Sequence, residues 1–283
     1  MQLIDGKLVG SVLRDEIKEE TLKLVSETGK KPNLKVIIVG ANPASQAYVN
    51  SKKKAALEVG FDSENIELPE EVSQEELLAL VDKLNKDESV NGILVQLPLP
   101  KHIDEQEVIK TIDIAKDVDG FHPEQVGGLS IGLETLEPCT PAGMVQLLKY
   151  YKIPIEGQNV VVIGRSNIVG KPIAQLLLKE HATVTITHSK TKNLSDITKQ
   201  ADIVVVALGV PGFLTGDMVK EGVVVLDVGI NRVDGKIVGD VDFDSVSKKA
   251  SYITPVPGGV GPMTITMLLF NTLKAFKMQN NIV

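Results

Sequence analysis

Short runs of valine and isoleucine that end at glycine recur along the chain and constrain its fold more than any other feature. The clearest are residues 34–39 (LKVIIV), followed by Gly40, and residues 159–163 (NVVVI), followed by Gly164. Runs this short and apolar are typical of strands buried on both faces, and the stretches between them carry apolar side chains at helical spacing. Strands that alternate with helices predict an α/β fold, in which helices cover both faces of a parallel sheet.

The expected elements follow one another along the whole chain. The expected strands are residues 34–39, 92–96, 159–163, 183–187, 202–207 and 223–228. The expected helices cover residues 11–28, 45–59, 170–179 and 264–276, with one more through Met144 and one that opens at Ser73. Ser73 and Glu76 have the spacing of a capping box, which marks a helix start.

The length of 283 residues is comfortable for two domains. Residues 116–141 are rich in glycine and proline and predict the main boundary between them. We expect one domain from residues 1–138 together with a C-terminal helix in 263–283, and a second domain from residues 139–262.

Composition excludes several classes of function. The net charge of −7 argues against nucleic-acid binding, which requires a basic face. Cys139 is the only cysteine, so neither an intrachain disulfide nor a cysteine-based zinc site is expected, and the four histidines lack ligand spacing. Residues 1–5 do not resemble the start of a signal peptide, and no apolar run reaches the ~18 residues of a membrane span. We therefore expect a cytoplasmic protein without a metal or a membrane contact.

Residues 159–172 predict a strand, a tight turn and a helix start, the place where a dinucleotide-binding fold holds a pyrophosphate. Backbone N–H groups and the helix dipole face the anion there. The match to G-x-G-x-x-G is imperfect, because Ser166 occupies the second glycine position and Gly170 comes one residue late. The pattern favours a nucleotide site and leaves a purely structural turn open.

The next expected strand ends at Thr187 and is followed by His188, Ser189 and Lys190, without a carboxylate. An enzyme that uses NAD usually has Asp or Glu there to bind the ribose 2′-hydroxyl. Arg165, in the first turn, could instead reach the 2′-phosphate of NADP. We therefore expect NADP as the cofactor; the alternative is that Arg165 and Lys190 are only solvated surface charges.

Tyr48 and Lys52 lie four residues apart in an expected helix, so that the phenol and the ammonium share one face. Such a pair is most often an ordinary surface pair. Gln96 ends a buried strand and Asp119 lies in a polar turn, and ligands of open parallel sheets bind beyond the carboxyl ends of strands. These four residues are therefore the candidates for a reacting site.

In the run at residues 255–264 (PVPGGVGPMT), the prolines fix the backbone and the glycines expose it, because they carry no side chain. Such a loop can lie against a flat ligand. A plain connector between domains is an equally good interpretation of its composition.

Six stretches, in order, resemble the methylenetetrahydrofolate dehydrogenase/cyclohydrolase family. They are residues 44–52 (ASQAYVNSK), similar to S-x-x-Y-V-x-x-K; 74–99, ending in QLPL; 116–120 (KDVDG); 138–141 (PCTP); 164–166 (GRS) with Val169 and Gly170; and 257–264 (PGGVGPMT). The resemblance spans nearly the whole chain, and six stretches in order are far more specific than any one of them.

The resemblance implies an N-terminal catalytic domain that binds folate, a Rossmann-like domain with a parallel sheet that binds NADP, a cleft between the two, and a homodimer formed through the NADP domains. It implies Lys52 as the central catalytic residue, with Gln96 supporting it. It also implies that Tyr48 lines the folate and that Asp119 binds the pterin. Further residues expected to bind folate are Val95, Leu97, Pro255, Pro257, Gly258 and Gly259. The expected NADP contacts are Gly164, Arg165, Ser166, Ser189 and Ile230.

The implied activity is oxidation of 5,10-methylenetetrahydrofolate with NADP, followed by hydrolysis of the methenyl product to 10-formyltetrahydrofolate. Hydrolysis needs proton transfers, and a lysine amine with the ordinary pKa of ~10.4 is a poor base at neutral pH. Burial and the cationic substrate would lower the pKa of Lys52, and Gln96 could accept its hydrogen bond without adding a charge. The alternatives are a dehydrogenase without useful cyclohydrolase activity and a non-catalytic nucleotide-binding sensor. We do not expect the ligase domain that larger relatives carry.

Overall fold

The computed structural model describes residues 1–282, with the side chain of Ala44 left out, and divides into two compact units. One is formed by residues 1–11 and 140–264, and we call it the six-stranded unit after its sheet. The other, the three-stranded unit, is formed by residues 12–139 and by the chain from residue 265 onward. Each unit therefore combines segments that are far apart in the sequence.

Six parallel strands form the sheet of the six-stranded unit, in the order β1-β11-β8-β7-β5-β6. They are β1 (Gln2–Leu3), β5 (Asn159–Ile163), β6 (Thr183–Thr187), β7 (Ile203–Val206), β8 (Val224–Asp227) and β11 (Tyr252–Ile253). Because β6 and β7 lie on opposite sides of β5, the strand order reverses there. The carboxyl end of β5 is thus the topological switch point, where ligands of such sheets bind.

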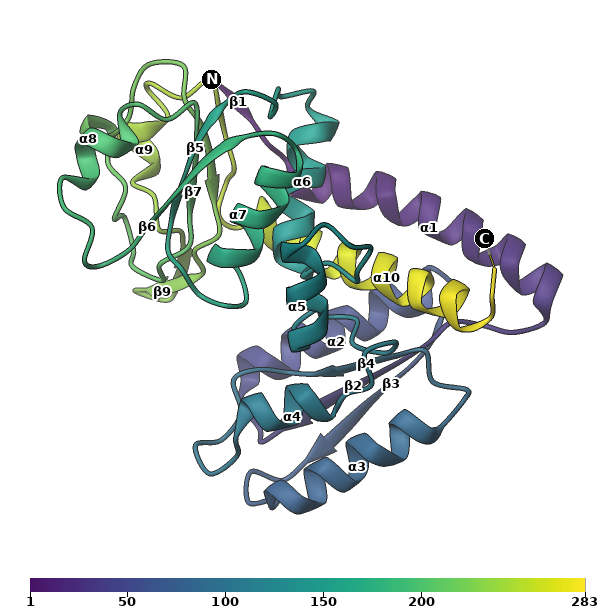
Figure 1. Ribbon diagram of the computed structural model, residues 1–283. Helices are drawn as coiled ribbons and strands as arrows, with labels where there is room; N and C mark the ends of the chain where they lie inside the picture. Colours follow the sequence, from purple (N-terminus) through teal and green to yellow (C-terminus); the bar gives the residue numbers. More distant parts are fainter. Residues whose placement is uncertain (283) are drawn as a thin grey trace. The chain divides into compact units, whose positions relative to one another are not determined.

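Helices cover both faces of this sheet (Figure 1). Helix α7 (Gly170–Lys179) packs on β5 and β6, whereas α8 (Leu194–Thr198) and α9 (Phe243–Val246) lie on the opposite face. Val161, Val204 and Val225 point into the core under α8 and α9. Every residue of β7 is buried, which explains why this strand is an unbroken run of Ile and Val.

A short antiparallel hairpin follows β8 and was not predicted from the sequence. Its strands are β9 (Asn231–Val233) and β10 (Lys236–Val238). Asp234 and Gly235 make the turn, both with positive φ, as the tightest hairpin turns require. A 3₁₀ helix, η1 (Gly216–Met218), lies earlier in the chain, before β8.

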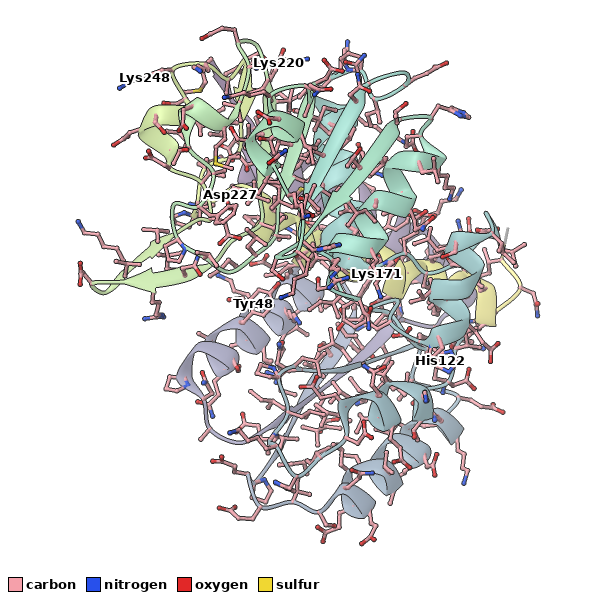
Figure 2. All side chains as sticks on the ribbon, turned by 60° about the vertical axis from the view of Figure 1, so that its left-hand side comes forward. Tyr48, His122, Lys171, Lys220, Asp227 and Lys248 are labelled. Atoms are coloured by element: carbon pink, nitrogen blue, oxygen red, sulfur yellow. The ribbon has the colours of Figure 1, made fainter. Side chains whose placement is uncertain are left out.

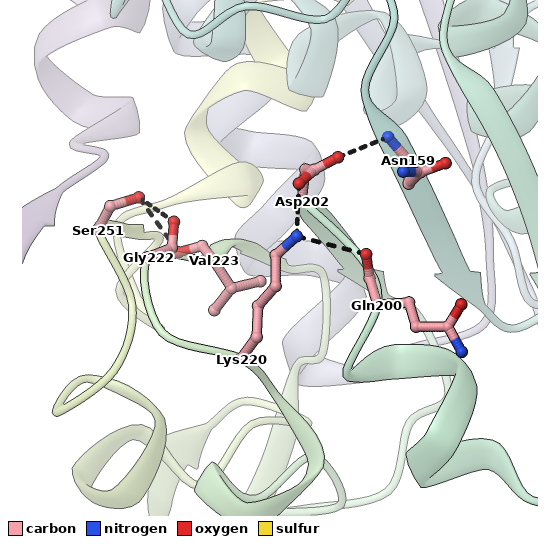
Figure 3. A network of polar contacts seen from close by, with 7 residues as sticks. All are labelled: Asn159, Gln200, Asp202, Lys220, Gly222, Val223 and Ser251. Atoms are coloured by element: carbon pink, nitrogen blue, oxygen red, sulfur yellow. Dashed lines mark hydrogen bonds and ion pairs between the residues drawn. The ribbon is translucent and has the colours of Figure 1, made fainter.

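Polar contacts fasten the amino-terminal ends of the parallel strands, at the edge opposite the switch point (Figure 3). The Asp202 carboxylate accepts the Asn159 N–H at 2.8 Å and pairs with the Lys220 ammonium at 2.5 Å. The Lys220 hydrogen bond and charge lower the pKa of Asp202. Ser251 donates to the carbonyl of Gly222 at 2.7 Å, which joins the starts of β8 and β11. Hydrogen bonds and an ion pair within the protein thus occupy the polar groups at this edge of the sheet.

The three-stranded unit has the parallel order β3-β2-β4, so its strand order reverses at β2. The strands are β2 (Asn33–Val39), β3 (Asp62–Leu68) and β4 (Gly92–Val95). Helices α3 (Gln74–Lys86) and α4 (Glu105–Thr111) cover one face, and α2 (Pro43–Glu58) packs on the other (Figure 1). The remaining helices of the chain are α1 (Gly6–Thr28), α5 (Pro123–Ser130), α6 (Cys139–Tyr150) and α10 (Val260–Gln279).

The structure confirms the α/β fold with parallel sheets. The capping box is present at the start of α3: the Ser73 side chain accepts the Glu76 N–H, and the Glu76 carboxylate accepts the Ser73 N–H. Strand β3 was missed because its sequence, DSENIEL, lies at a sheet edge and is largely polar. No helix within residues 1–282 is long and apolar enough to cross a membrane.

The division into units falls between residues 139 and 140, next to the boundary expected from the sequence. Residues 1–11, however, belong to the six-stranded unit rather than to the segment that follows them. The cause is β1, which pairs with β11, and the fully buried Ile4 extends this pairing by donating its N–H to the Ile253 carbonyl at 2.9 Å.

Candidate functional site

Lys52 forms the centre of a polar cluster in the three-stranded unit. It lies on α2, one turn after Tyr48 (labelled in Figure 2), and is only 4 % exposed. Its Nζ donates to Gln96 Oε1 at 2.9 Å and lies 4.6 Å from the centre of the Tyr48 ring. Gln96 follows β4 and donates from Nε2 to the Leu97 carbonyl at 2.7 Å, which turns its oxygen toward the amine.

Burial controls the charge of this amine. It lowers the pKa of Lys52 from the usual 10.5, while Asp119 and Cys139 act in the opposite direction. The Tyr48 ring also favours the ammonium, since a cation is attracted to an aromatic face. Burial likewise raises the pKa of Asp119, and the Lys52 charge opposes that rise. The two groups are therefore close enough to influence each other, and the pKa of Lys52 falls less than burial alone would lower it.

A tight turn presents Asp119 to this cluster. The buried Asp117 carboxylate accepts the His122 N–H at 2.7 Å and so closes the turn from inside. On the other side, Lys116 Nζ donates to the carbonyls of Leu84, Asn85 and Asp87 at the end of α3. These backbone contacts fix residues 116–122 beside β4, where Asp117 forms a parallel bridge with Ile93, the second residue of that strand.

Cys139 and Asn271 complete the surroundings of Asp119, and sequence reasoning assigned neither of them a role. The buried Cys139 thiol donates to the Val118 carbonyl at 3.2 Å, and burial raises its pKa well above the usual 9.0. Asn271 Nδ2 donates to the Val118 and Glu137 carbonyls at 2.9 and 2.8 Å. Cys139 lies in residues 138–141 (PCTP), one of the six stretches that resemble the family. Asn271, more than a hundred residues away, lies in none of these stretches.

The expected site residues Val95 and Leu97 flank Gln96. Val95 ends β4 and is 5 % exposed, and Leu97 is partly buried. The structure thus brings Tyr48, Lys52 and Gln96 into direct contact, with Asp119 beside them.

The turn after β5 has the geometry of a pyrophosphate site. Gly164 has φ of +123°, and a Cβ there would overlap the carbonyl of Ala207. A Cβ on Gly170 would overlap the carbonyl of Gly164. Ser166 Oγ accepts the N–H groups of Val169 and Gly170, both at 3.2 Å, at the start of α7. The turn lies at the switch point and leads into a helix N-terminus, which suits an anion.

Arg165 and Ser189 lie at the same edge of the sheet. Both side chains are exposed, Arg165 in the turn after β5 and Ser189 after β6. The Gly164 N–H donates to the Thr187 carbonyl at 3.0 Å and ties this turn to the end of β6.

The other expected ligand residues line a pocket of about 200 Å³ in the six-stranded unit. Its walls include Ile230 and residues 255–262, which cover the expected Pro255, Pro257, Gly258 and Gly259, and also Lys7, which sequence reasoning missed. Lys7 approaches Gly258, and a Gly258 Cβ would lie 3.4 Å from its side chain. Ile230 is 69 % exposed, so its apolar side chain is open to a ligand.

Two family models match the chain. Residues 4–119 match the tetrahydrofolate dehydrogenase/cyclohydrolase catalytic domain, and residues 138–280 match the NAD(P)-binding domain of the same family. The chain belongs to the tetrahydrofolate dehydrogenase/cyclohydrolase family. The family resemblance expected from the sequence is therefore confirmed.

Curated and solved members of the tetrahydrofolate dehydrogenase/cyclohydrolase family match end to end. The bifunctional protein FolD of Exiguobacterium sibiricum is 59 % identical over 97 % of this chain and 99 % of its own length. The crystal structure of the bifunctional FolD enzyme from Campylobacter jejuni is 56 % identical, with a TM-score of 0.96 over 98 % of this chain and 99 % of that one. The Trypanosoma brucei enzyme, solved with NADP and an inhibitor, is 44 % identical, with a TM-score of 0.93 over 98 % and 97 %.

Proposed function

We propose that the chain oxidises 5,10-methylenetetrahydrofolate with NADP and then hydrolyses the methenyl product to 10-formyltetrahydrofolate. The observation that carries this proposal is the buried Lys52 amine, held by Gln96 and Tyr48 in a member of the tetrahydrofolate dehydrogenase/cyclohydrolase family. A sensor that only binds a nucleotide has no use for this cluster. We assign residues 1–138 and the helix in 263–283 to folate binding and residues 139–262 to NADP, with the first strand completing the NADP sheet.

The turn after β5 fits NADP by its shape. Gly164 and Gly170 leave room for a pyrophosphate against bare backbone, and Ser166 holds the start of α7 in place. Arg165 would hold the 2′-phosphate, because no carboxylate follows β6 to bind a 2′-hydroxyl. Ser189 and Ile230 would complete the contacts at the carboxyl edge. When bound, NADP supplies the acceptor for the hydride that leaves the methylene carbon.

Folate would be oriented mainly by Asp119 and Tyr48. The carboxylate can accept hydrogen bonds from pterin N–H groups, and the aromatic ring offers a face for stacking. Val95 and Leu97 add apolar contacts, and Pro255, Pro257, Gly258 and Gly259 would provide a flat wall. Positioning of this kind is the main contribution a protein makes to a hydride transfer.

Lys52 would move the protons of the hydrolysis. The methenyl group carries a positive charge. Its binding should further lower the pKa of Lys52, which burial already lowers. The neutral amine can then take a proton from the attacking water and later return it to the departing ring nitrogen. Gln96 accepts the Lys52 hydrogen bond without supplying a negative charge, so it orients the amine and leaves its basicity tunable.

The test compares Lys52→Met with Lys54→Met, a control whose side chain is 80 % exposed two residues away. Purified protein is mixed with methylenetetrahydrofolate and NADP, and absorbance follows methenyl formation and then its decay. We expect hydrolysis to fall by about 100-fold or more in Lys52→Met and to stay unchanged in Lys54→Met. Normal hydrolysis in Lys52→Met would disprove the assignment, and oxidation without hydrolysis in the unaltered enzyme would favour a monofunctional dehydrogenase. The same assay with NAD should give a much lower kcat/KM than NADP.

We also propose that two copies associate through the six-stranded unit. A pocket of about 610 Å³ there includes Val233 of the hairpin and Phe243 of α9, which are 40 % and 37 % exposed. Ile237, at 39 %, adds to the apolar surface of the hairpin. Exposed apolar patches of this kind mark interfaces. We place the enzyme in the cytoplasm, whose reducing conditions suit the unpaired Cys139 thiol.

A further inference from the structure

Two buried carboxylates at the carboxyl edge of the six-stranded sheet are not used by the proposed chemistry. Asp227, labelled in Figure 2, ends β8 and is 4 % exposed. Asp240 follows the hairpin and is fully buried. Burying a carboxylate is costly unless hydrogen bonds satisfy its oxygens, so the partners of these two groups indicate what they do.

Within residues 1–282, the Asp227 carboxylate accepts hydrogen bonds from backbone N–H groups alone. Its Oδ1 accepts from Gly229 and Asp240, both at 2.9 Å, and its Oδ2 accepts from Val241 at 3.0 Å. A Cβ at Gly239 would overlap this carboxylate. Asp227 therefore joins the exit of β8 to the segment that returns from the hairpin.

Asp240 continues the connection to the neighbouring strand. Its Oδ2 accepts the N–H groups of Leu208 and Gly209 at 2.7 and 2.8 Å, just beyond β7, and its Oδ1 accepts Asn231 Nδ2 at 2.9 Å. A Cβ at Gly229 would overlap Asp240, so the segment after β8 and the segment after the hairpin are packed in contact. The carboxylate thus holds the loop after β7 against the base of the hairpin.

Both tied loops border the proposed NADP site. Ala207, directly before Leu208, lies against Gly164 in the pyrophosphate turn. Gly229, directly before Ile230, lines the pocket that Ile230 and residues 255–262 form. We propose that Asp227 and Asp240 are positioning residues that pre-set the loops after β7 and β8 for NADP. The inference rests on the proposed function, since it concerns the same cofactor site.

The geometry separates two variants with the same chemical change. In Asp240→Asn, the amide oxygen can keep the Leu208 and Gly209 bonds, while the Asn231 amide rotates to present its oxygen to the new NH₂ group and loses only its long, 3.5 Å contact to the Val238 carbonyl. In Asp227→Asn, an NH₂ group must face a backbone N–H, because every partner is a backbone donor and none can rotate. The first change is tolerated by this arrangement and the second is not.

The experiment measures KM for NADP in the dehydrogenase reaction and kcat/KM for hydrolysis of supplied methenyltetrahydrofolate, which needs no NADP. We expect KM for NADP to rise about tenfold or more in Asp227→Asn and Asp240→Ala, and to stay within about threefold in Asp240→Asn. Hydrolysis should stay within about twofold in all three. Glu221→Ala, an exposed residue at the amino-terminal end of β8, removes one charge as the control and should change neither activity.

An equal KM for NADP in Asp227→Asn and Asp240→Asn, or an unchanged KM in Asp240→Ala, would overturn the positioning role. If Asp227→Asn does not fold, hydrogen exchange in the unaltered enzyme decides the question: the Leu208, Gly209, Gly229 and Val241 amides should be protected without ligand, and free exchange there would refute the inference. Failure of the unaltered enzyme to reduce NADP would instead count against the proposed function.

Discussion

Asp117 and Asp119 lie two residues apart in one turn, and their surroundings give them different tasks. Burial raises the pKa of Asp119, and the charge of the Lys52 ammonium acts against that rise. Asp117 is 1 % exposed, and burial together with the Asp119 charge raises its pKa to about 7, against the backbone N–H groups that favour its ionised form. Asp119 is thus available to a ligand, whereas Asp117 organises the turn and titrates near neutral pH.

This assignment predicts how stability depends on pH. The folded pKa of Asp117, about 7, lies above the unfolded value of 3.8, so its contribution to the free energy of unfolding is present below pH 4 and is lost as pH rises through 7. In the unaltered protein, the free energy of unfolding measured with urea should decline between pH 5 and pH 8. We expect this decline to be smaller by roughly 1–3 kcal/mol in Asp117→Asn. Asp82→Asn, on the exposed side of α3, should keep the full decline. A decline in Asp117→Asn as large as in the unaltered protein would contradict the assigned pKa.

Individual site residues could be predicted from the sequence only where a local pattern carried them. Tyr48 and Lys52 share a helix face, and Gln96 ends an apolar strand, so their convergence followed from spacing. Asp227 and Asp240 could not be found in this way, because their role depends on backbone N–H groups that the hairpin brings back to β8. A buried carboxylate that binds only backbone leaves no periodic mark in the sequence.

At the scale of elements, three residues determine the geometry of the turn between β5 and α7. Gly164 has a positive φ and no space for a Cβ, Gly170 has no space either, and Ser166 satisfies the N–H groups at the start of the helix. The departures from G-x-G-x-x-G thus belong to a turn in which a serine side chain holds the helix start.

Gly164→Ala should therefore damage the NADP site specifically. The new methyl group must displace the Ala207 carbonyl and with it the loop after β7. We expect NADP affinity, measured by calorimetric titration, to fall by about tenfold or more, while hydrolysis of methenyltetrahydrofolate is retained. Gly127→Ala in α5 is the matched control, because a Cβ there meets no atom within 4 Å. Full NADP affinity in Gly164→Ala would show that the turn does not bind the cofactor.

Elements were predictable where their sequence carries an apolar or β-branched run, which includes the largely exposed edge strand β6 (TVTIT). Strand β7 is buried throughout and is an unbroken apolar run, and β2 and β5 carry the apolar runs 36–39 and 160–163. The edge strand β3 and the three-residue strands of the hairpin have no such run, because solvent on one side or a short pairing leaves their composition free. Tertiary pairing, rather than local preference, makes these segments strands.

At the scale of the whole molecule, the proposed dimer gives the hairpin its role. Val233→Asp combined with Ile237→Asp should convert the dimer into a monomer in sedimentation velocity, since charges replace apolar side chains that a partner would bury. Leu22→Asp, at a more exposed position of α1 in the three-stranded unit, should leave the dimer intact. An unaltered protein that sediments as a monomer, or a double variant that remains dimeric, would refute this interface.

The pairing of β1 with β11 has a consequence for the order in which the protein can be completed. Gln2 and Leu3 are synthesised long before their partners Tyr252 and Ile253, which lie far along the sequence. Strand β1 therefore cannot form its hydrogen bonds in the sheet until β11 has been synthesised. Removing Gln2 and Leu3 would leave β11 at the edge of the sheet, with unpaired backbone groups that other chains could bind.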